Sequence, residues 1–130
     1  VPGLADVPAL VAASRAAGAE VRLDDRIAAA DHALLAPSLG RLVHGIVQEG
    51  LTNAHRHAPG APVEVALSGA PGEGLVVAVE NPLAPGGEGG AGTGLATLRE
   101  RVAMLGGELD ARAARGRFAL RAALPWEAGS

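Results

Sequence analysis

The sequence predicts a two-layer α+β sandwich, in which a mixed, mostly antiparallel sheet is covered on one face by helices. Short segments of alternating apolar residues occur in pairs joined by turns, which is typical of antiparallel hairpins. Two longer segments have apolar residues at steps of three and four, which indicates amphipathic helices. The chain has 130 residues, near the commonest domain size, and contains neither a repeat nor a linker. We therefore expect one domain over residues 1–130.

The first helix and the first strand are expected near the amino terminus. Apolar residues have helical spacing from Val7 to Ala17, and Gly18 is suited to end a helix. Side chains alternate from Ala19 to Asp24, which predicts a strand. The stretch from Asp24 to Ala36 is ambiguous, and we interpret it as a second short strand or a loop that ends at Pro37.

The longest helix is expected over Ser38 to His57, before the helix-breaking pair Pro59-Gly60. Its apolar residues form one stripe at steps of three and four. A hairpin should follow, with strands over Val63–Leu67 and Leu75–Val79. The second strand is almost continuously apolar, so we expect it to be the more buried of the two.

The last part of the chain is expected to contain a loop, a helix and a hairpin. Pro82 to Gly92 has no periodicity and is interpreted as a loop. A second amphipathic helix is predicted over Leu95 to Leu105. The strands of the final hairpin are expected over Glu108–Arg112 and Arg117–Leu124.

The composition excludes several classes of function. The net charge is −3 and aromatic residues make up 2%, so nucleic-acid binding is not expected. The absence of cysteine excludes disulfides, thiol catalysis and cysteine–zinc sites. No apolar run has the length of a membrane span. Because the chain begins with Val1 and not Met, we expect it to be cut from a longer protein.

A glycine-rich run before the second long helix predicts a phosphate-binding site. Gly90, Gly92 and Gly94 let the backbone approach an anion without interference from Cβ atoms. The following helix offers unpaired N–H groups and the positive end of its dipole. Loops of this kind bind phosphate groups.

A second candidate feature is the polar face of the long helix, where Glu49, Asn53 and His57 recur at four-residue steps. Mg²⁺ prefers oxygen ligands and takes only one or two from a protein, which the Asn53 amide and the Glu49 carboxylate can supply. Glu49 can also take a proton from a nucleophile. Arg56 or His57 can reach phosphate oxygens. The alternative is a solvated helix face with an incidental asparagine.

Two further features have competing interpretations. Asn81 stands at the end of the apolar strand, where its side chain can bond a base edge or simply begin an Asn-Pro turn. Arg99 and Arg101 can steady phosphates or a partner's carboxylate, or lie on a solvated helix face. The other histidines have no metal-binding spacing, and no serine has the context of a catalytic nucleophile.

These segments resemble a known family. Residues Ile46–Ala58, IVQEGLTNAHRHA, closely resemble the N box of bacterial sensor histidine kinases, in the subgroup paired with NarL-type response regulators. Gly90–Leu95, with Leu98–Val102 and Leu105–Gly107, resembles the glycine box and following helix of that subgroup. Pro2–Leu23 resembles the segment that joins the phosphoacceptor helices to the ATPase domain.

The resemblance implies the Bergerat ATP-binding fold, shared with type II topoisomerases, Hsp90 and MutL. It implies ATP and Mg²⁺ as ligands, and transfer of the γ-phosphoryl group to a histidine on a separate dimerisation and phosphoacceptor domain. Residues 1–18 would form the junction with that domain, and residues 82–93 the ATP lid. A NarL-type response regulator would be a partner. The parent protein would be dimeric and could be membrane-anchored, with this chain as a monomeric cytoplasmic domain.

The resemblance also implies roles for individual residues. Asn53 would hold Mg²⁺, and Glu49 would orient or deprotonate the acceptor histidine or bind the metal through water. The residues expected to bind the nucleotide are Asn53, Arg56, His57, Asn81, Gly90, Gly92, Thr93, Gly94 and Leu95.

The chain departs from the family pattern in two places. The family has an Asp-x-Gly-x-Gly motif, whose Asp accepts a hydrogen bond from adenine, where this chain has Asn81–Pro85. The chain also has no acceptor histidine in a phosphoacceptor helix, so it cannot autophosphorylate alone. Two alternatives therefore stay open: a serine kinase of the anti-sigma-factor type, and a degenerate nucleotide-binding or interaction module without transfer activity.

Overall fold

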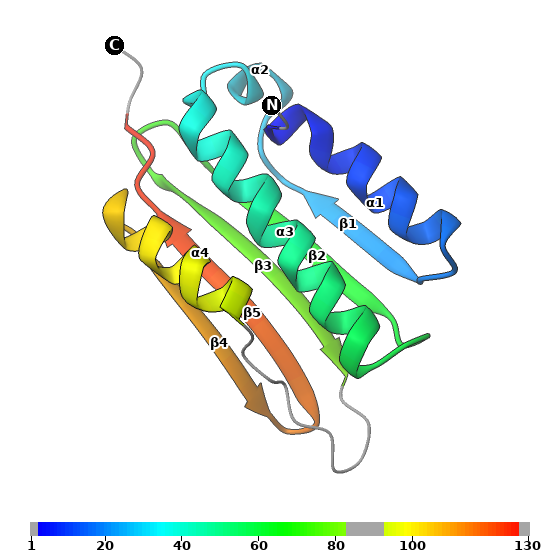
Figure 1. The fold of residues 1–130 in the computed structure, drawn as a ribbon. Coiled ribbons are helices and arrows are strands. Elements are labelled where there is room, and N and C mark those ends of the chain that lie inside the picture. Colours follow the sequence, from blue (N-terminus) through cyan, green and yellow to red (C-terminus); the bar gives the residue numbers. More distant parts are fainter. Residues whose placement is uncertain (1–2, 83–92, 128–130) are drawn as a thin grey trace.

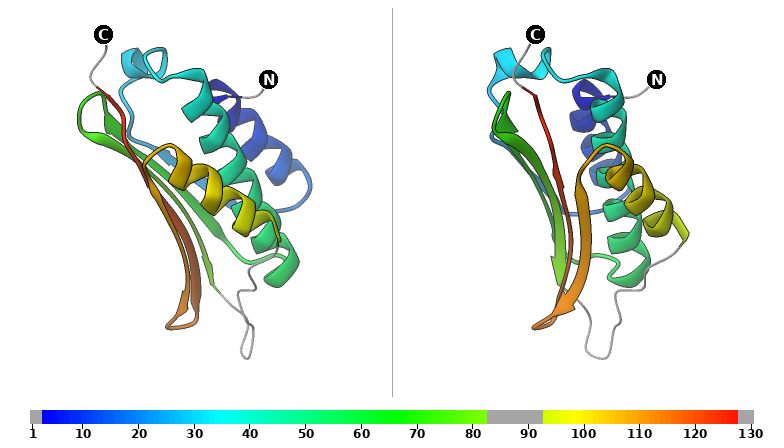
Figure 2. Two further views of the ribbon diagram at one scale, coloured as in Figure 1. Left: turned by 60° about the vertical axis from the view of Figure 1, so that its left-hand side comes forward. Right: turned by 90° about the vertical axis from the view of Figure 1, so that its left-hand side faces the viewer.

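The structure, a computed structural model, describes residues 3–82 and 93–127. It has two layers, with the sheet on one side and α1, α3 and α4 together on the other (Figures 1 and 2). The elements are η1 (Leu4–Asp6), α1 (Val7–Ala16), β1 (Val21–Asp25), α2 (Ala29–His32), α3 (Pro37–His57), β2 (Val63–Ala70), β3 (Gly74–Pro82), α4 (Thr93–Met104), β4 (Glu108–Ala114) and β5 (Arg117–Leu124). The predicted fold class is confirmed.

The sheet is mixed, with the strand order β1-β2-β3-β5-β4. Strands β1 and β2 are parallel, and the other neighbouring strands are antiparallel. A parallel pair needs a long crossover connection, and α2 and α3 provide it between β1 and β2. The antiparallel pairs β2–β3 and β4–β5 are the two predicted hairpins. Strands β2, β3 and β4 are longer than expected from the sequence, and β5 has the expected bounds.

The segment after β1 is neither the second strand nor the plain loop that the sequence allowed. It contains the one-turn helix α2, and the strand interpretation is wrong. The Asp25 carboxylate explains the change of direction. One of its oxygens accepts a hydrogen bond from the Ile27 N–H at 3.0 Å, and the other lies 3.0 Å from Nε2 of His32. These local contacts end the strand and turn the chain toward α3.

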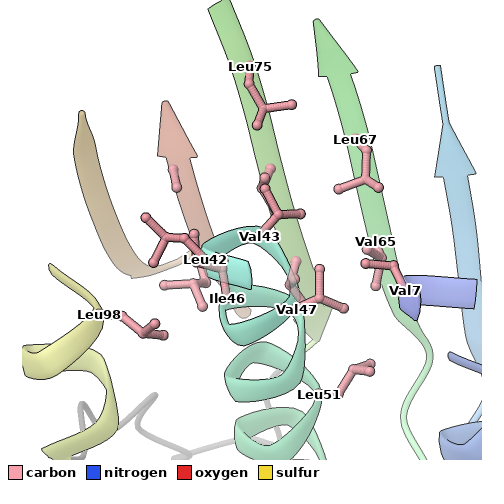
Figure 3. Packing of buried hydrophobic residues seen from close by; sticks show 14 of the residues in the cluster. Val7, Leu42, Val43, Ile46, Val47, Leu51, Val65, Leu67, Leu75 and Leu98 are labelled. Carbon is pink, nitrogen blue, oxygen red and sulfur yellow. The ribbon is translucent and has the colours of Figure 1, made fainter. Parts of the chain in front are cut away.

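The core lies between the two layers (Figure 3). The apolar stripe of α3 supplies Val43, Ile46 and Val47, which are fully buried against the sheet. Strand β3 alternates as a half-covered strand should, with Leu75, Val77 and Val79 buried. Complete burial of such a side chain contributes about 1.5–3 kcal/mol.

The amino-terminal segment belongs to the same core. Leu4, Val7 and Val11 are buried, and η1 and α1 contact α3. Helix α3 is the longest helix, but its far side is polar. Among the described residues, no helix is both long enough and apolar enough to cross a membrane.

Candidate functional site

One close contact between the layers sets the position of the site. A Cβ atom placed on Gly50 of α3 would lie 2.7 Å from Cβ and Cγ1 of Val79 in β3. Real Cβ atoms do not approach this closely, so only glycine lets α3 lie so near the strand. The helical periodicity of the sequence did not reveal this role of Gly50. The available signal was the glycine itself, since glycine inside a helix costs about 1 kcal/mol and needs a packing reason.

Asn53, one turn beyond Gly50, has an unpaired amide in the interior. The residue is 3% exposed, and its Nδ2 has no hydrogen-bond partner in the part of the chain that the structure describes. Burying such a group without a partner costs about 1–3 kcal/mol. The interpretation of Asn53 as part of a solvated helix face is therefore wrong. Native proteins pair their buried polar groups, so an unpaired one needs a specific explanation.

The neighbouring polar residues of α3 differ in exposure. Glu49 and His57 are half-buried, and with Asn53 they follow one side of the helix at four-residue steps. Arg56 is exposed, so it does not share the burial of the other three residues. The structure thus brings Glu49, Asn53 and His57 together and leaves Arg56 in solvent.

Asn81 is the second buried amide at this end of the molecule. It is 2% exposed, and its Nδ2 donates a hydrogen bond to the Pro82 carbonyl at 3.1 Å. It is the last inward-facing residue of β3, two positions beyond Val79, and it pairs with Phe118 of β5. Asn81 therefore lies in the sheet, and the interpretation as a simple Asn-Pro turn is wrong. Asn53 comes three residues after Gly50 in α3, and Asn81 comes two residues after Val79 in β3, so each asparagine lies shortly beyond the Gly50–Val79 contact.

The start of α4 completes the described part of the site. A Cβ atom on Gly94 would overlap the Glu49 carboxylate, so the first turn of α4 lies directly against that carboxylate. The free N–H groups of a helix amino terminus attract anions. Leu95 is 1% exposed and packs in the core, so its side chain is not available to a ligand.

Part of the predicted site lies outside the described residues. This holds for Gly90, Gly92 and most of the proposed 82–93 lid, and for the side chain of Thr93. Arg99 has a local role, because its Nε donates to the Leu109 carbonyl at 3.3 Å and ties α4 to β4.

The residues present fit a magnesium–nucleotide ligand. Rotation of the Asn53 amide presents either its oxygen to a cation or its NH₂ group to a phosphate oxygen. Within residues 3–82 and 93–127, no group of three or more His, Cys, Asp or Glu side chains could hold a metal ion. Mg²⁺ does not require such a group, since it keeps waters and phosphate oxygens as ligands. Gly94 leaves the space beside Glu49 free of a side chain.

No protein-family model matches the chain, and no curated protein does either. Solved structures do match. The histidine kinase domain from the Erythrobacter litoralis EL346 blue-light activated histidine kinase superposes with a TM-score of 0.70 at 22% identity, over 96% of this chain and 61% of that one. Full-length ShkA in complex with AMPPNP superposes with a TM-score of 0.70 at 20% identity, over 98% of this chain and 30% of ShkA. The catalytic domain of the histidine kinase ThkA superposes with a TM-score of 0.67 at 13% identity, over 95% of this chain and 90% of the ThkA domain.

The chain therefore has the fold of histidine kinase catalytic domains. It spans 61% of the Erythrobacter kinase domain and 42% of the longer Erythrobacter kinase chain. At these identities the likeness establishes the fold, and the activity has to be argued from the site.

Proposed function

We propose that the chain is the ATP-binding kinase domain of a sensor histidine kinase, which donates the γ-phosphoryl group of ATP to a histidine on a separate dimerisation and phosphoacceptor domain. The observation that carries the proposal is the buried Asn53 amide, whose Nδ2 has no hydrogen-bond partner among residues 3–82 and 93–127. It lies in a fold shared with histidine kinase catalytic domains, and full-length ShkA, which also superposes on the chain, is in complex with AMPPNP. A triphosphate with its metal ion would satisfy this amide.

Each site residue has a role in this proposal. The Asn53 amide oxygen would hold Mg²⁺, and its NH₂ group would donate to a phosphate oxygen. His57 and the first turn of α4 would hold further phosphate oxygens. When bound, Mg²⁺ would neutralise negative charge as the phosphoryl group moves. Glu49 is held beside Gly94 at the edge of this site. Its carboxylate would orient the incoming imidazole and accept its proton.

Asn81 would bind the base. Its Nδ2 donates to the Pro82 carbonyl. The Oδ1 atom is an acceptor, which suits the exocyclic amino group of adenine, a donor. The amide is neutral, so this bond is weaker than the one a carboxylate would make.

The partners are also proposals. The resemblance of Ile46–Ala58 to the N box of the NarL-partnered subgroup favours a NarL-type response regulator as the final acceptor. A dimeric parent protein would present its acceptor helices to this domain. Residues 1–18 would join the domain to those helices.

Calorimetry with ATP and Mg²⁺ tests the nucleotide site. We expect saturable binding that is lost in Asn53→Ala and retained in Glu73→Gln, which changes an exposed carboxylate in the turn between β2 and β3. The absence of binding at millimolar ATP would overturn the proposal.

Transfer is tested with γ-labelled ATP and a helical domain that carries an acceptor histidine, joined ahead of residue 3. We expect label on that histidine, lost in Glu49→Gln, in which ATP binding persists. Binding without any transfer would favour the non-catalytic module, and label on a serine of the acceptor would favour the anti-sigma-type kinase.

A further inference from the structure

Helices α3 and α4 form an antiparallel pair with the nucleotide site at one end only. Glu49 lies against Gly94, and a Cβ atom on Gly45 would make an ordinary contact of 3.5 Å with Leu98, one turn further along both helices. Figure 1 shows the two helices side by side on the same face of the sheet, and Figure 2 agrees. At the opposite end of the pair, the start of α3 lies beside the end of α4.

A groove of about 190 Å³ lies at this opposite end. Each wall contributes three residues with the same spacing. The second residue comes three positions after the first, and the third follows directly after the second. The lining residues are Ser38, Arg41 and Leu42 from the start of α3 and Arg101, Met104 and Leu105 from the end of α4. We call this surface the α3–α4 groove.

The α3–α4 groove exposes apolar surface. Met104 is 84% exposed and Leu105 is 37% exposed. In the described part of the chain, Leu34 is the only other large apolar side chain with comparable exposure. Single exposed apolar residues are common, and here two adjacent ones lie beside a groove.

The groove is also positively charged. Arg41 and Arg101 are exposed, and neither has an ion-pair or hydrogen-bond partner among the residues that the structure describes. No acidic residue lines the groove, although the chain as a whole has a net charge of −3. The two guanidinium groups therefore border an apolar surface that no carboxylate lines, although Arg41 also lines the adjoining pocket that contains Asp6.

We propose that the α3–α4 groove is a docking site for an amphipathic helix of a partner protein, with Asp or Glu residues along the borders of its apolar face. A channel between two helices accepts the ridge of side chains on a third helix. Carboxylates on that helix would pair with Arg41 and Arg101 on opposite walls. A second copy of this chain is a poorer occupant, because a symmetric contact would bring the same arginines together.

Methyl NMR tests this proposal without nucleotide, so its result is independent of the kinase assignment. Met104 is the only methionine in the chain, so labelling the methionine methyl group produces one signal, from the groove itself. The probe is a designed helical peptide with leucines on one face and glutamates along both borders. The control peptide has lysine at every glutamate position.

We expect the glutamate peptide to shift the Met104 signal saturably, and the lysine peptide to leave it unchanged. Arg41→Gln and Arg101→Gln should each weaken binding about two- to five-fold, as loss of an exposed ion pair does. Added salt should weaken binding by screening. Arg112→Gln, which removes an exposed arginine on β4, should have no effect.

Three results would overturn the proposal. One is no shift with the glutamate peptide at about 1 mM, where even weak docking is measurable. Another is an equal shift with both peptides, which would mean that charge does not select the partner. The third is a shift that depends on protein concentration alone, which would identify a second copy as the occupant.

Discussion

At the scale of single residues, two buried asparagines have different hydrogen-bonding states. Asn81 is satisfied in part by the carbonyl of its neighbour Pro82. Nδ2 of Asn53 is unpaired within the described part of the chain and therefore opposes folding. A residue that lowers stability in the free protein and is satisfied by a ligand is the expected signature of a binding position.

Asn53→Ala tests this trade-off. The substitution removes a buried amide whose Nδ2 has no partner among the residues that the structure describes. The unfolding free energy should therefore stay within about 1 kcal/mol of the parent value or rise. Stabilisation by MgATP should disappear. Urea unfolding, with and without MgATP, measures both quantities. A loss of more than about 2 kcal/mol without ligand would mean that the amide has a structural role.

Asn81→Asp should have two opposite effects. A carboxylate oxygen would face the Pro82 carbonyl, so the unfolding free energy should fall by about 1–3 kcal/mol. ATP should bind more tightly, because a charged acceptor makes the stronger hydrogen bond. Urea unfolding and calorimetry measure the two effects. Unchanged affinity would show that Asn81 does not face adenine.

At the scale of elements, the packing of α3 on β3 determines where the polar end of the helix lies. Gly50 allows the close approach to Val79. Gly45 lies on the same helix but has room for a methyl group, since the nearest atom to its Cβ would be Cδ2 of Leu98 at 3.5 Å. Gly45 is therefore a control position for Gly50 within the same helix.

Gly50→Ala should lower the unfolding free energy by about 1–3 kcal/mol, because the added methyl group forces α3 away from β3. Gly45→Ala should be neutral or stabilising by up to about 1 kcal/mol, since alanine favours the helix. In the Gly50→Ala background, Val79→Ala should restore part of the loss. Urea unfolding of the three variants and the parent chain provides the measurement. Equal losses at Gly50 and Gly45 would contradict the close contact.

At the scale of the whole molecule, the candidate site and the chain's only tryptophan lie at opposite ends of the sheet. Trp126 is 4% exposed and follows β5, whose last residue, Leu124, pairs with Leu75. Asn81 lies six residues further along β3, a distance of about 20 Å. Trp126 emission should therefore report unfolding and not the site itself.

Ligand and metal removal should change the stability of the whole domain. MgATP at about one hundred times its Kd should raise the unfolding free energy by about 2.7 kcal/mol. Trp126 emission of the folded chain should stay the same. Chelation of Mg²⁺ should remove most of the stabilisation, because the phosphates lose their counter-ion. An equal effect of ATP with and without Mg²⁺ would contradict the proposed role of Asn53.

The sequence alone determined the elements whose pattern is local. The apolar stripe predicted the bounds of α3 to within one residue, since the helix begins at Pro37 and was expected from Ser38. The two hairpins followed from the alternation of side chains and from the turns between the strands. It also selected Glu49 and Asn53 as candidates. The tertiary structure decided what depends on strand order and helix approach: the burial of Asn53, the place of Asn81 inside the sheet, and the contact between Glu49 and Gly94. The physical reason is that periodicity reports which side of an element is buried, whereas the neighbour it meets depends on residues far away in the chain.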